Sequence, residues 1–113
     1  MSRARPLVSI VVPVFNEEGN VTALYQAVRR VFDPLADRYD VEIIFTDNRS
    51  TDGTFAEVMR LATDDARVRG FRFSRNFGFQ RSIYTGYMMA RGDVAIQLDC
   101  DLQDPPELIE VFL

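Results

Sequence analysis

Strand-type apolar runs alternate with helical apolar patterns along this chain, and that order constrains the fold more than any other feature. The runs at 8–12, 41–45 and 94–98 each predict a strand, and the near-continuous β-branched run at 8–12 is typical of a strand buried on both faces of a parallel sheet. Residues 68–73 alternate, which predicts a further strand at a sheet edge. We therefore expect one α/β domain over residues 1–113, with a parallel sheet of about four strands and helices on both faces.

Three helices are predicted between these strands, each with one apolar face turned to the sheet. The first ends at Asp33-Pro34, the second is capped by Thr51 or Asp52, and the third is ended by Arg91-Gly92-Asp93. The expected inner faces are Val21, Leu24, Tyr25, Val28 and Phe32 for the first helix; Phe55, Val58, Met59 and Ala62 for the second; and Ile83, Tyr84, Tyr87 and Met88 for the third. A fourth helix, with Asp104 as cap and Pro105 in its first turn, is expected to run on past Leu113 in a longer protein.

The composition excludes several kinds of site. With one cysteine, Cys100, and no histidine, the chain cannot form an internal disulfide, a Cys/His zinc site or a Ser-His-Asp triad. Its net charge of −4 argues against nucleic acid as a partner. The apolar run at 8–15 is too short to span a bilayer. We expect a cytoplasmic location, or the cytoplasmic face of the membrane for a full-length protein anchored through downstream segments.

Polar clusters follow three of the expected strands, at 13–18, 46–52 and 99–104. In a parallel α/β sheet, ligands bind beyond the carboxyl ends of the strands, so these clusters are expected to converge on a ligand. Each cluster alone also fits a structural role, because Asn, Asp, Ser and Glu are common in turns and at helix starts. Asp104 and Glu107 fit such a capping role best.

Asp99 and Asp101 differ from residues of an ordinary turn because a buried strand delivers them together. Two like charges at such a place are costly unless a cation compensates them. Carboxylates are hard oxygen ligands suited to Mg²⁺ or Mn²⁺, which complete their shell with water and substrate phosphate oxygens. A metal held here is expected to bridge to a diphosphate.

Four motifs in this order resemble those of family 2 glycosyltransferases: Val12-Pro-Val-Phe-Asn-Glu-Glu18, Thr46-Asp-Asn-Arg-Ser-Thr-Asp-Gly-Thr54, Arg75-Asn-Phe-Gly78 and Asp99-Cys-Asp-Leu-Gln-Asp-Pro-Pro-Glu107. The most similar subgroup is the polyprenyl-phosphate and dolichol-phosphate sugar transferases, whose motifs often read Pro-x-Tyr-Asn-Glu and Asp-Ala-Asp-Leu-Gln. The resemblance covers essentially the whole chain. It implies a truncated GT-A fold, a Rossmann-like nucleotide-diphospho-sugar transferase fold, of which this chain is the N-terminal, donor-binding part.

The resemblance also implies roles for particular residues. The donor-binding positions are Pro13, Phe15 and Glu17 around the nucleoside, Thr46, Asp47 and Asn48 near the base, and Asp99 and Cys100 along the ribose and diphosphate. The metal positions are Asp101 and Gln103, with Asp99 binding directly or through water. Arg75 matches an arginine that approaches the nucleotide, although a surface or capping role fits it equally. No catalytic residue is assigned, because the acceptor side lies beyond the chain.

Two departures from the family pattern concern the second motif. Arg49 stands where the family has a glycine, so the turn is expected to differ there. Asn48 stands where the family has a carboxylate. Guanine presents two donors on its pairing edge and suits a carboxylate, whereas uracil presents a donor beside an acceptor and suits an amide. We therefore expect a UDP-sugar rather than a GDP-sugar.

The implied reaction is inverting transfer of a hexosyl group from a nucleoside-diphosphate sugar to an acceptor, with a polyprenyl phosphate as the expected lipid-phosphate acceptor. The 113-residue chain alone is expected to bind the donor without catalysing transfer. A non-catalytic nucleotide-binding or scaffold module of the same fold is the alternative. A dehydrogenase is disfavoured because residues 13–19 lack the Gly-x-Gly-x-x-Gly turn. If the chain ends near Leu113, uncovered helix faces and a sheet edge favour a homodimer.

Overall fold

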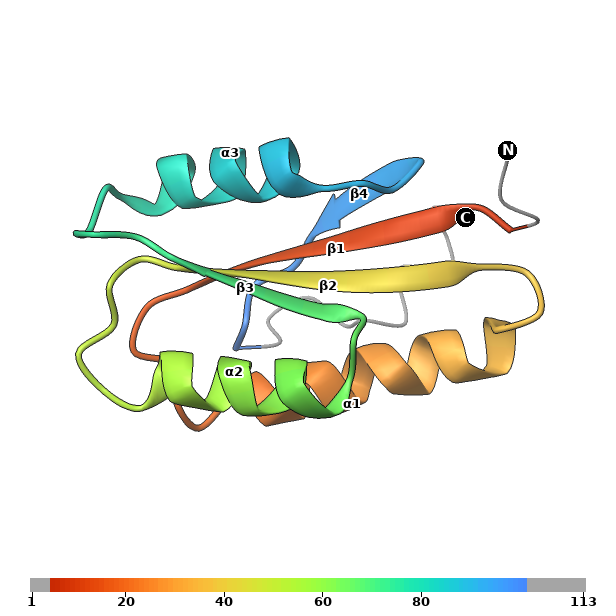
Figure 1. Cartoon of the computed structure of the whole chain (residues 1–113), viewed down its shortest axis with the longest axis horizontal. Coiled ribbons are helices and arrows are strands. Elements are labelled where there is room, and N and C mark those ends of the chain that lie inside the picture. The colour runs from red at the N-terminus through yellow and green to blue at the C-terminus, as the bar shows by residue number, and fades with distance from the viewer. Residues whose placement is uncertain (1–4, 102–113) are drawn as a thin grey trace.

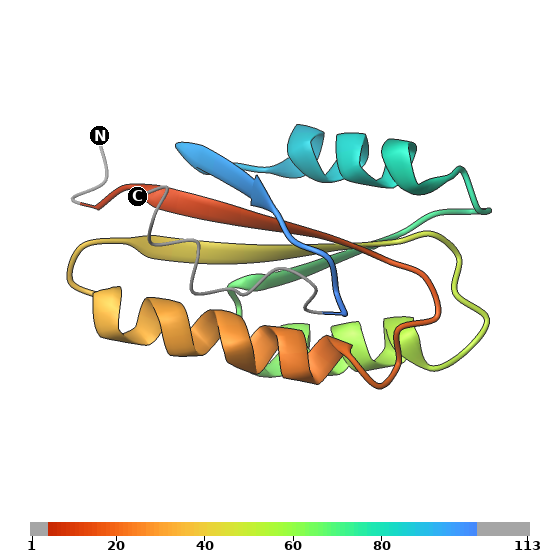
Figure 2. The same ribbon diagram turned by 180° about the vertical axis from the view of Figure 1, so that it is seen from behind.

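The protein is seen in a computed structural model that describes residues 5–101 (Figure 1). The elements, in chain order, are β1 (Leu7–Val14), α1 (Val21–Phe32), a 3-10 turn η1 (Asp33–Leu35), β2 (Asp40–Asp47), α2 (Thr54–Asp64), β3 (Val68–Arg72), α3 (Phe79–Met89) and β4 (Val94–Gln97). The strands form one parallel sheet in the order β3-β2-β1-β4. Helices α1 and α2 cover one face of this sheet and α3 covers the other (Figures 1 and 2). The expected α/β fold is confirmed, while the expected helix after Pro105 lies outside the described residues.

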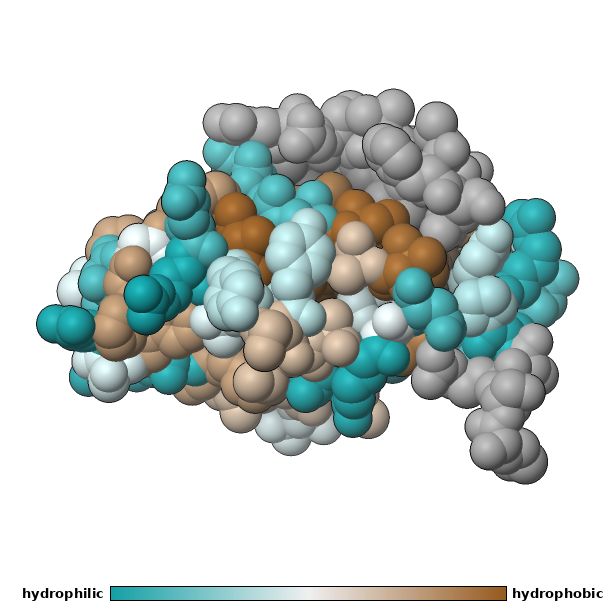
Figure 3. Space-filling model, turned by 90° about the horizontal axis from the view of Figure 1, so that it is seen from above, coloured by the Kyte–Doolittle hydropathy of each residue, from teal (hydrophilic) through white to brown (hydrophobic). Residues whose placement is uncertain are grey.

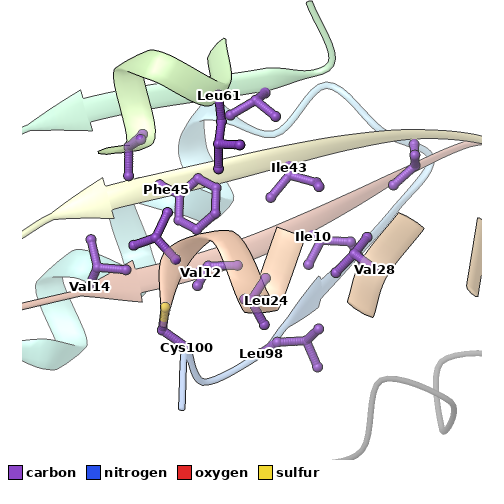
Figure 4. Close-up of a cluster of buried hydrophobic side chains, with 14 of the residues drawn as sticks. Ile10, Val12, Val14, Leu24, Val28, Ile43, Phe45, Leu61, Leu98 and Cys100 are labelled. Atoms are coloured by element: carbon purple, nitrogen blue, oxygen red, sulfur yellow. The ribbon is translucent and has the colours of Figure 1, made fainter. Parts of the chain in front are cut away.

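The main core lies between the sheet and the α1/α2 layer (Figure 4). Alternate residues of β1 and β2 point into it, including Ile10, Val12, Ile43 and Phe45, each at most 2% exposed. Leu24 is among the α1 residues that meet them, as the helical spacing in the sequence predicts. Each such side chain contributes about 1.5–3 kcal/mol when it is fully buried, so this layer holds the central strands in place.

The expected inner face of α2 is partly wrong. Val58 is buried as predicted, but Met59 is 43% exposed and Leu61 is buried instead. The reason is the position of α2 over the edge strand β3, where Val58 and Met59 lie against Gly70. Met59 therefore faces the border of the sheet rather than its middle. Asp52 precedes the N-cap residue of α2, and its carboxylate accepts a hydrogen bond from the N–H of Thr54 at 3.0 Å.

The expected inner face of α3 is wrong. Tyr84 and Met88 are 65% and 63% exposed, while Ser82 and Gly86 are buried against the sheet. A Cβ at Gly86 would lie 2.2 Å from Cγ1 of Val11, so α3 approaches β1 more closely than a larger residue allows. Small residues, rather than the aromatic ones, therefore form the packed face of this helix.

A buried polar cluster joins the other end of the sheet to the chain after α3. Glu42 accepts hydrogen bonds from Ser9 at 2.6 Å and from the backbone N–H of Arg91 at 2.7 Å, and it pairs with Arg69 at 3.1 Å. Burial by itself would raise the pKa of Glu42, but these hydrogen bonds outweigh burial and hold the pKa below its ordinary value. Glu42 is therefore a charged structural group far from the predicted ligand site.

Candidate donor-binding site

The loops after β1, β2 and β3 gather at one edge of the sheet, on the left in Figure 1. The first two loops are joined by hydrogen bonds between side chains and backbone. The side-chain oxygen of Asn16 accepts a hydrogen bond from the N–H of Thr51 at 2.8 Å, and the N–H of Asn16 donates one to the hydroxyl of Ser50 at 2.9 Å. The N–H of Glu17 donates to the hydroxyl of Thr54 at 2.8 Å. These contacts fix the relative position of the first two polar clusters.

The turn at Arg49 keeps the backbone conformation that a glycine would adopt, with φ of 67°. The expectation that the turn differs there is therefore wrong at the level of the backbone. Asn16 also has a positive φ, of 53°, in the loop that faces it. The hydrogen bonds between the two loops compensate for the unfavourable conformation of both residues.

Thr46 and Asp47 lie beneath the loops, fully buried, with their polar atoms engaged inside the protein. The hydroxyl of Thr46 is 2.8 Å from that of Ser82, which ties the end of β2 to α3. The carboxylate of Asp47 accepts the N–H and the hydroxyl of Ser50 and pairs with Arg72, whose Nε lies 3.3 Å from Oδ2. These two predicted donor-binding residues therefore support the site from below.

Asn48, in contrast, lines a pocket. This pocket has a volume of about 250 Å³ and lies among Pro13, Val14, Phe15, Glu17, Asn48, Asn76, Phe79 and Ser82. The side-chain oxygen of Asn48 accepts the N–H of Phe77 at 2.8 Å, so the loop after β3 is held against the end of β2. Four predicted donor-binding residues, Pro13, Phe15, Glu17 and Asn48, therefore meet at one hollow.

The sequence prediction missed four lining residues, Val14, Asn76, Phe79 and Ser82. Asn76 and Phe79 stand in or beside the Arg75-Asn-Phe-Gly78 motif, from which only Arg75 was singled out. Ser82 gave no signal, because its burial results from the close packing of α3. Arg75 itself lies over the ring of Phe77, 4.7 Å from its centroid, and is exposed at the rim next to Asn76.

The third polar cluster follows β4 on the α1 side of the sheet. Asp99 is half-buried, and its Oδ1 accepts a hydrogen bond from Gln97 at 2.9 Å, while Asp101 is exposed. Cys100 between them is 2% exposed and packs in the main core (Figure 4). Burial, together with the negative charges of Glu17 and Asp101, raises the pKa of its thiol to about 12. The two carboxylates are therefore presented from a firmly anchored segment.

Asp99 and Asp101 come from one loop and offer hard oxygen ligands that suit Mg²⁺ or Mn²⁺. Among residues 5–101, no three His, Cys, Asp or Glu side chains are grouped so that they could hold a metal by themselves. Gln103, the third predicted metal ligand, lies outside the described residues. The pair fits a metal that takes its remaining ligands from the substrate or from water.

Comparison with known proteins identifies the family. The family model described as glycosyl transferase family 2 matches residues 9–113. A prophage bactoprenol glucosyl transferase homolog from Escherichia coli K12 is 43% identical over 102 residues, covering 90% of this chain and 33% of that protein. An undecaprenyl-phosphate 4-deoxy-4-formamido-L-arabinose transferase from Aeromonas hydrophila is 41% identical over 105 residues, covering 91% and 31%. The chain thus spans about a third of the length of these relatives.

The fold also matches solved structures. A mannosyltransferase from Pyrobaculum calidifontis, determined with GDP-mannose and Mn²⁺, superimposes with a TM-score of 0.70 at 23% identity, over 89% of this chain and 33% of that one. At this identity the match shows a shared GT-A architecture. No helix within the described part of the chain is long and apolar enough to cross a membrane.

Proposed function

Because the chain belongs to glycosyl transferase family 2, we propose that it is the donor-binding part of an enzyme that transfers a hexosyl group from a nucleoside-diphosphate sugar to a polyprenyl phosphate, with inversion. The observation that carries the proposal is the pocket where Pro13, Phe15, Glu17 and Asn48 meet at the carboxyl ends of β1 and β2. Ligands bind at this place in open α/β sheets. The names of the bactoprenol and undecaprenyl-phosphate relatives support the lipid-phosphate acceptor.

The geometry of Asn48 supports a uracil base. The N–H of Phe77 is a donor, so the atom of Asn48 that faces it is the side-chain oxygen, which leaves the amide NH₂ as the donor available to a ligand. The pairing edge of uracil offers one N–H donor between two carbonyl acceptors, whereas the pairing edge of guanine offers two donors and one acceptor. We therefore propose UDP rather than GDP as the nucleotide part of the donor, with Phe15, 44% exposed at the pocket, supplying apolar contact to the base or ribose.

Asp99 and Asp101, together with Gln103, are the proposed ligands of a Mg²⁺ or Mn²⁺ ion. The ion supplies Lewis-acid stabilisation of the negative charge on a departing nucleoside diphosphate. The protein's part is to hold the two carboxylates, and the packing of Leu98 and Cys100 in the core fixes the loop that carries them. Because Cys100 is 2% exposed and packs in the main core, it serves as a small core residue between the two carboxylates.

The test is calorimetric titration of UDP and of GDP into the 113-residue chain, with Mn²⁺ and then with a chelator. We expect UDP to bind more tightly than GDP, to lose affinity with the chelator, and to bind poorly to Asp101→Ala. Asp37→Ala, which removes an exposed carboxylate near η1, is the matched control and should leave binding unchanged. If a folded sample binds neither nucleotide, or if GDP binds more tightly than UDP, the corresponding part of the proposal is wrong.

A further inference from the structure

The charges of this chain are unevenly distributed. Acidic side chains outnumber basic ones, 17 to 13, yet residues 66–92 contain no Asp or Glu. The same segment carries six arginines: Arg67, Arg69, Arg72, Arg75, Arg81 and Arg91. It comprises β3, the loop after it, and α3, so basic residues are concentrated in this part of an otherwise acidic chain.

The outer face of α3 adds exposed apolar and aromatic groups to this layer. Arg81, Tyr84 and Met88 are spaced by three and four residues and so form one stripe along α3, and Phe77, which precedes the helix, extends this stripe because its ring lies beside Arg81. This stripe lies on the side of α3 away from the sheet, opposite the buried Ser82 and Gly86. Viewed from the α3 side, much of this face consists of apolar and weakly polar side chains with separate strongly hydrophilic ones among them (Figure 3).

Two of the arginines at this face are not held by carboxylates. Within residues 5–101, Arg69 and Arg91 pair with Glu42 and Arg72 pairs with Asp47. Arg75 and Arg81 instead lie over the ring of Phe77, at 4.7 and 5.8 Å from its centroid. An open groove of about 770 Å³ runs beside them, lined by Phe77, Gln80, Arg81, Tyr84 and Thr85.

We propose that this stripe of α3 binds the surface of an anionic lipid bilayer. Tyrosine rings prefer the headgroup region, apolar side chains such as those of Phe and Met enter the boundary with the acyl chains, and arginines without carboxylate partners are attracted to anionic lipids. The sequence placed membrane association only in downstream segments, whereas the fold provides a contact surface within the described residues. Because Phe79 opens α3 and also lines the pocket, a bilayer at this face lies beside the candidate donor site.

Charge favours a bilayer over a second copy of the chain as the occupant of this face. A two-fold symmetric contact made by the stripe would place Arg75 and Arg81 near their own copies, with no acidic residue in the segment to compensate them. An anionic lipid surface supplies the missing negative charge. The inference does not depend on the proposed transferase activity, because lipid binding requires no nucleotide.

The test is co-sedimentation of the 113-residue chain, without nucleotide, with vesicles of phosphatidylglycerol or of phosphatidylcholine. We expect binding to phosphatidylglycerol vesicles that weakens at high salt. The double variant Arg75→Ala/Arg81→Ala should bind about 30-fold more weakly, as expected for two arginines at an anionic surface. Arg30→Ala/Arg38→Ala is the matched control, because it removes the same charge from exposed positions in and after α1, across the sheet.

A second variant separates the apolar contribution from the charge. Tyr84→Ser/Met88→Ser changes exposed positions only, so it should stay folded by circular dichroism and still bind more weakly. Equal binding to both kinds of vesicle, equal weakening by the control pair, or no binding would overturn the proposal. The proposal would also be overturned if the chain does not bind vesicles and light scattering instead finds a dimer that Tyr84→Ser/Met88→Ser dissociates.

Discussion

Replacing Gly86 with alanine should destabilise the protein, although glycine inside a helix normally costs about 1 kcal/mol relative to alanine. The new Cβ would lie 2.2 Å from Cγ1 of Val11, whereas carbon atoms rest at about 3.5–4.0 Å. Val11 is fully buried and β-branched, so its side chain has little freedom to move aside. The helix must therefore move outward, which also weakens the contact between Ser82 and Thr46.

Overpacking of this kind costs about 1–3 kcal/mol, and the contact is short enough to place Gly86→Ala near the upper end. After the gain in helix propensity, we expect the free energy of unfolding to fall by about 1–2 kcal/mol. Val11→Ala alone should cost about 2 kcal/mol, because two buried methyl groups are lost and a cavity remains. In the Val11→Ala background, however, Gly86→Ala should be stabilising by about 0.5–1 kcal/mol, because the added methyl group enters the vacated space and the helix propensity improves.

Urea denaturation followed by far-UV circular dichroism measures all four members of this cycle, and unchanged m-values would show that the comparison is sound. Gly19→Ala is the matched control, because no atom lies within 4 Å of its added Cβ and its φ is not positive. The reasoning is refuted if Gly86→Ala alone is as stable as the wild type. It is also refuted if the loss persists unchanged when Val11 is already alanine.

Three further predictions concern single side chains. Asn48→Asp should weaken UDP binding about three- to tenfold and strengthen GDP binding. The reason is that a carboxylate can still accept a hydrogen bond from the N–H of Phe77 but cannot donate one to uracil. Calorimetry that shows no change in the preference for UDP over GDP would contradict this. Glu42→Gln should lower the free energy of unfolding at pH 7 by about 2 kcal/mol. The folded pKa of Glu42 lies below its ordinary value, so this stabilisation is present above pH about 4.3 and is lost as the pH falls through the folded pKa. Urea curves of the variant and wild type should therefore differ at pH 7 and approach each other as the pH is lowered. Cys100, with a pKa of about 12, should react with a thiol reagent at pH 8 only as fast as the protein unfolds locally, and should react rapidly in urea. Fast modification of the folded protein would show that the thiol lies outside the core.

Much of the fold could be predicted because its signals are local. The β-branched runs gave β1, β2 and β4 within a few residues, and the alternating run gave β3 at a sheet edge. The inner face of α1 also followed from helical spacing, because that helix packs through large apolar residues such as Leu24 and Val28. The family followed from four motifs, which together are far more specific than any one of them.

The candidate site could be predicted only in outline. The sequence placed Asp47 and Asn48 together as donor-binding residues, yet Asp47 is fully buried with Ser50 and Arg72 while Asn48 lines the pocket. Asp47 is the last residue of β2 and Asn48 follows it, so the two side chains point in different directions, and what each one meets depends on distant segments. The role of the predicted metal ligands stays a prediction, with Gln103 outside the described residues.

What the sequence determined by itself is the order of strands and helices and the location of polar groups after the strands, because periodicity and turn chemistry act over a few residues. Only the tertiary structure decided which face of α3 is buried, because the close packing of Ser82 and Gly86 depends on Val11 in β1 and Thr46 in β2. The same is true of the amide of Asn48, whose orientation depends on the backbone of Phe77, 29 residues further on. Contacts between distant segments thus decided which groups hold the fold together and which are available to a ligand.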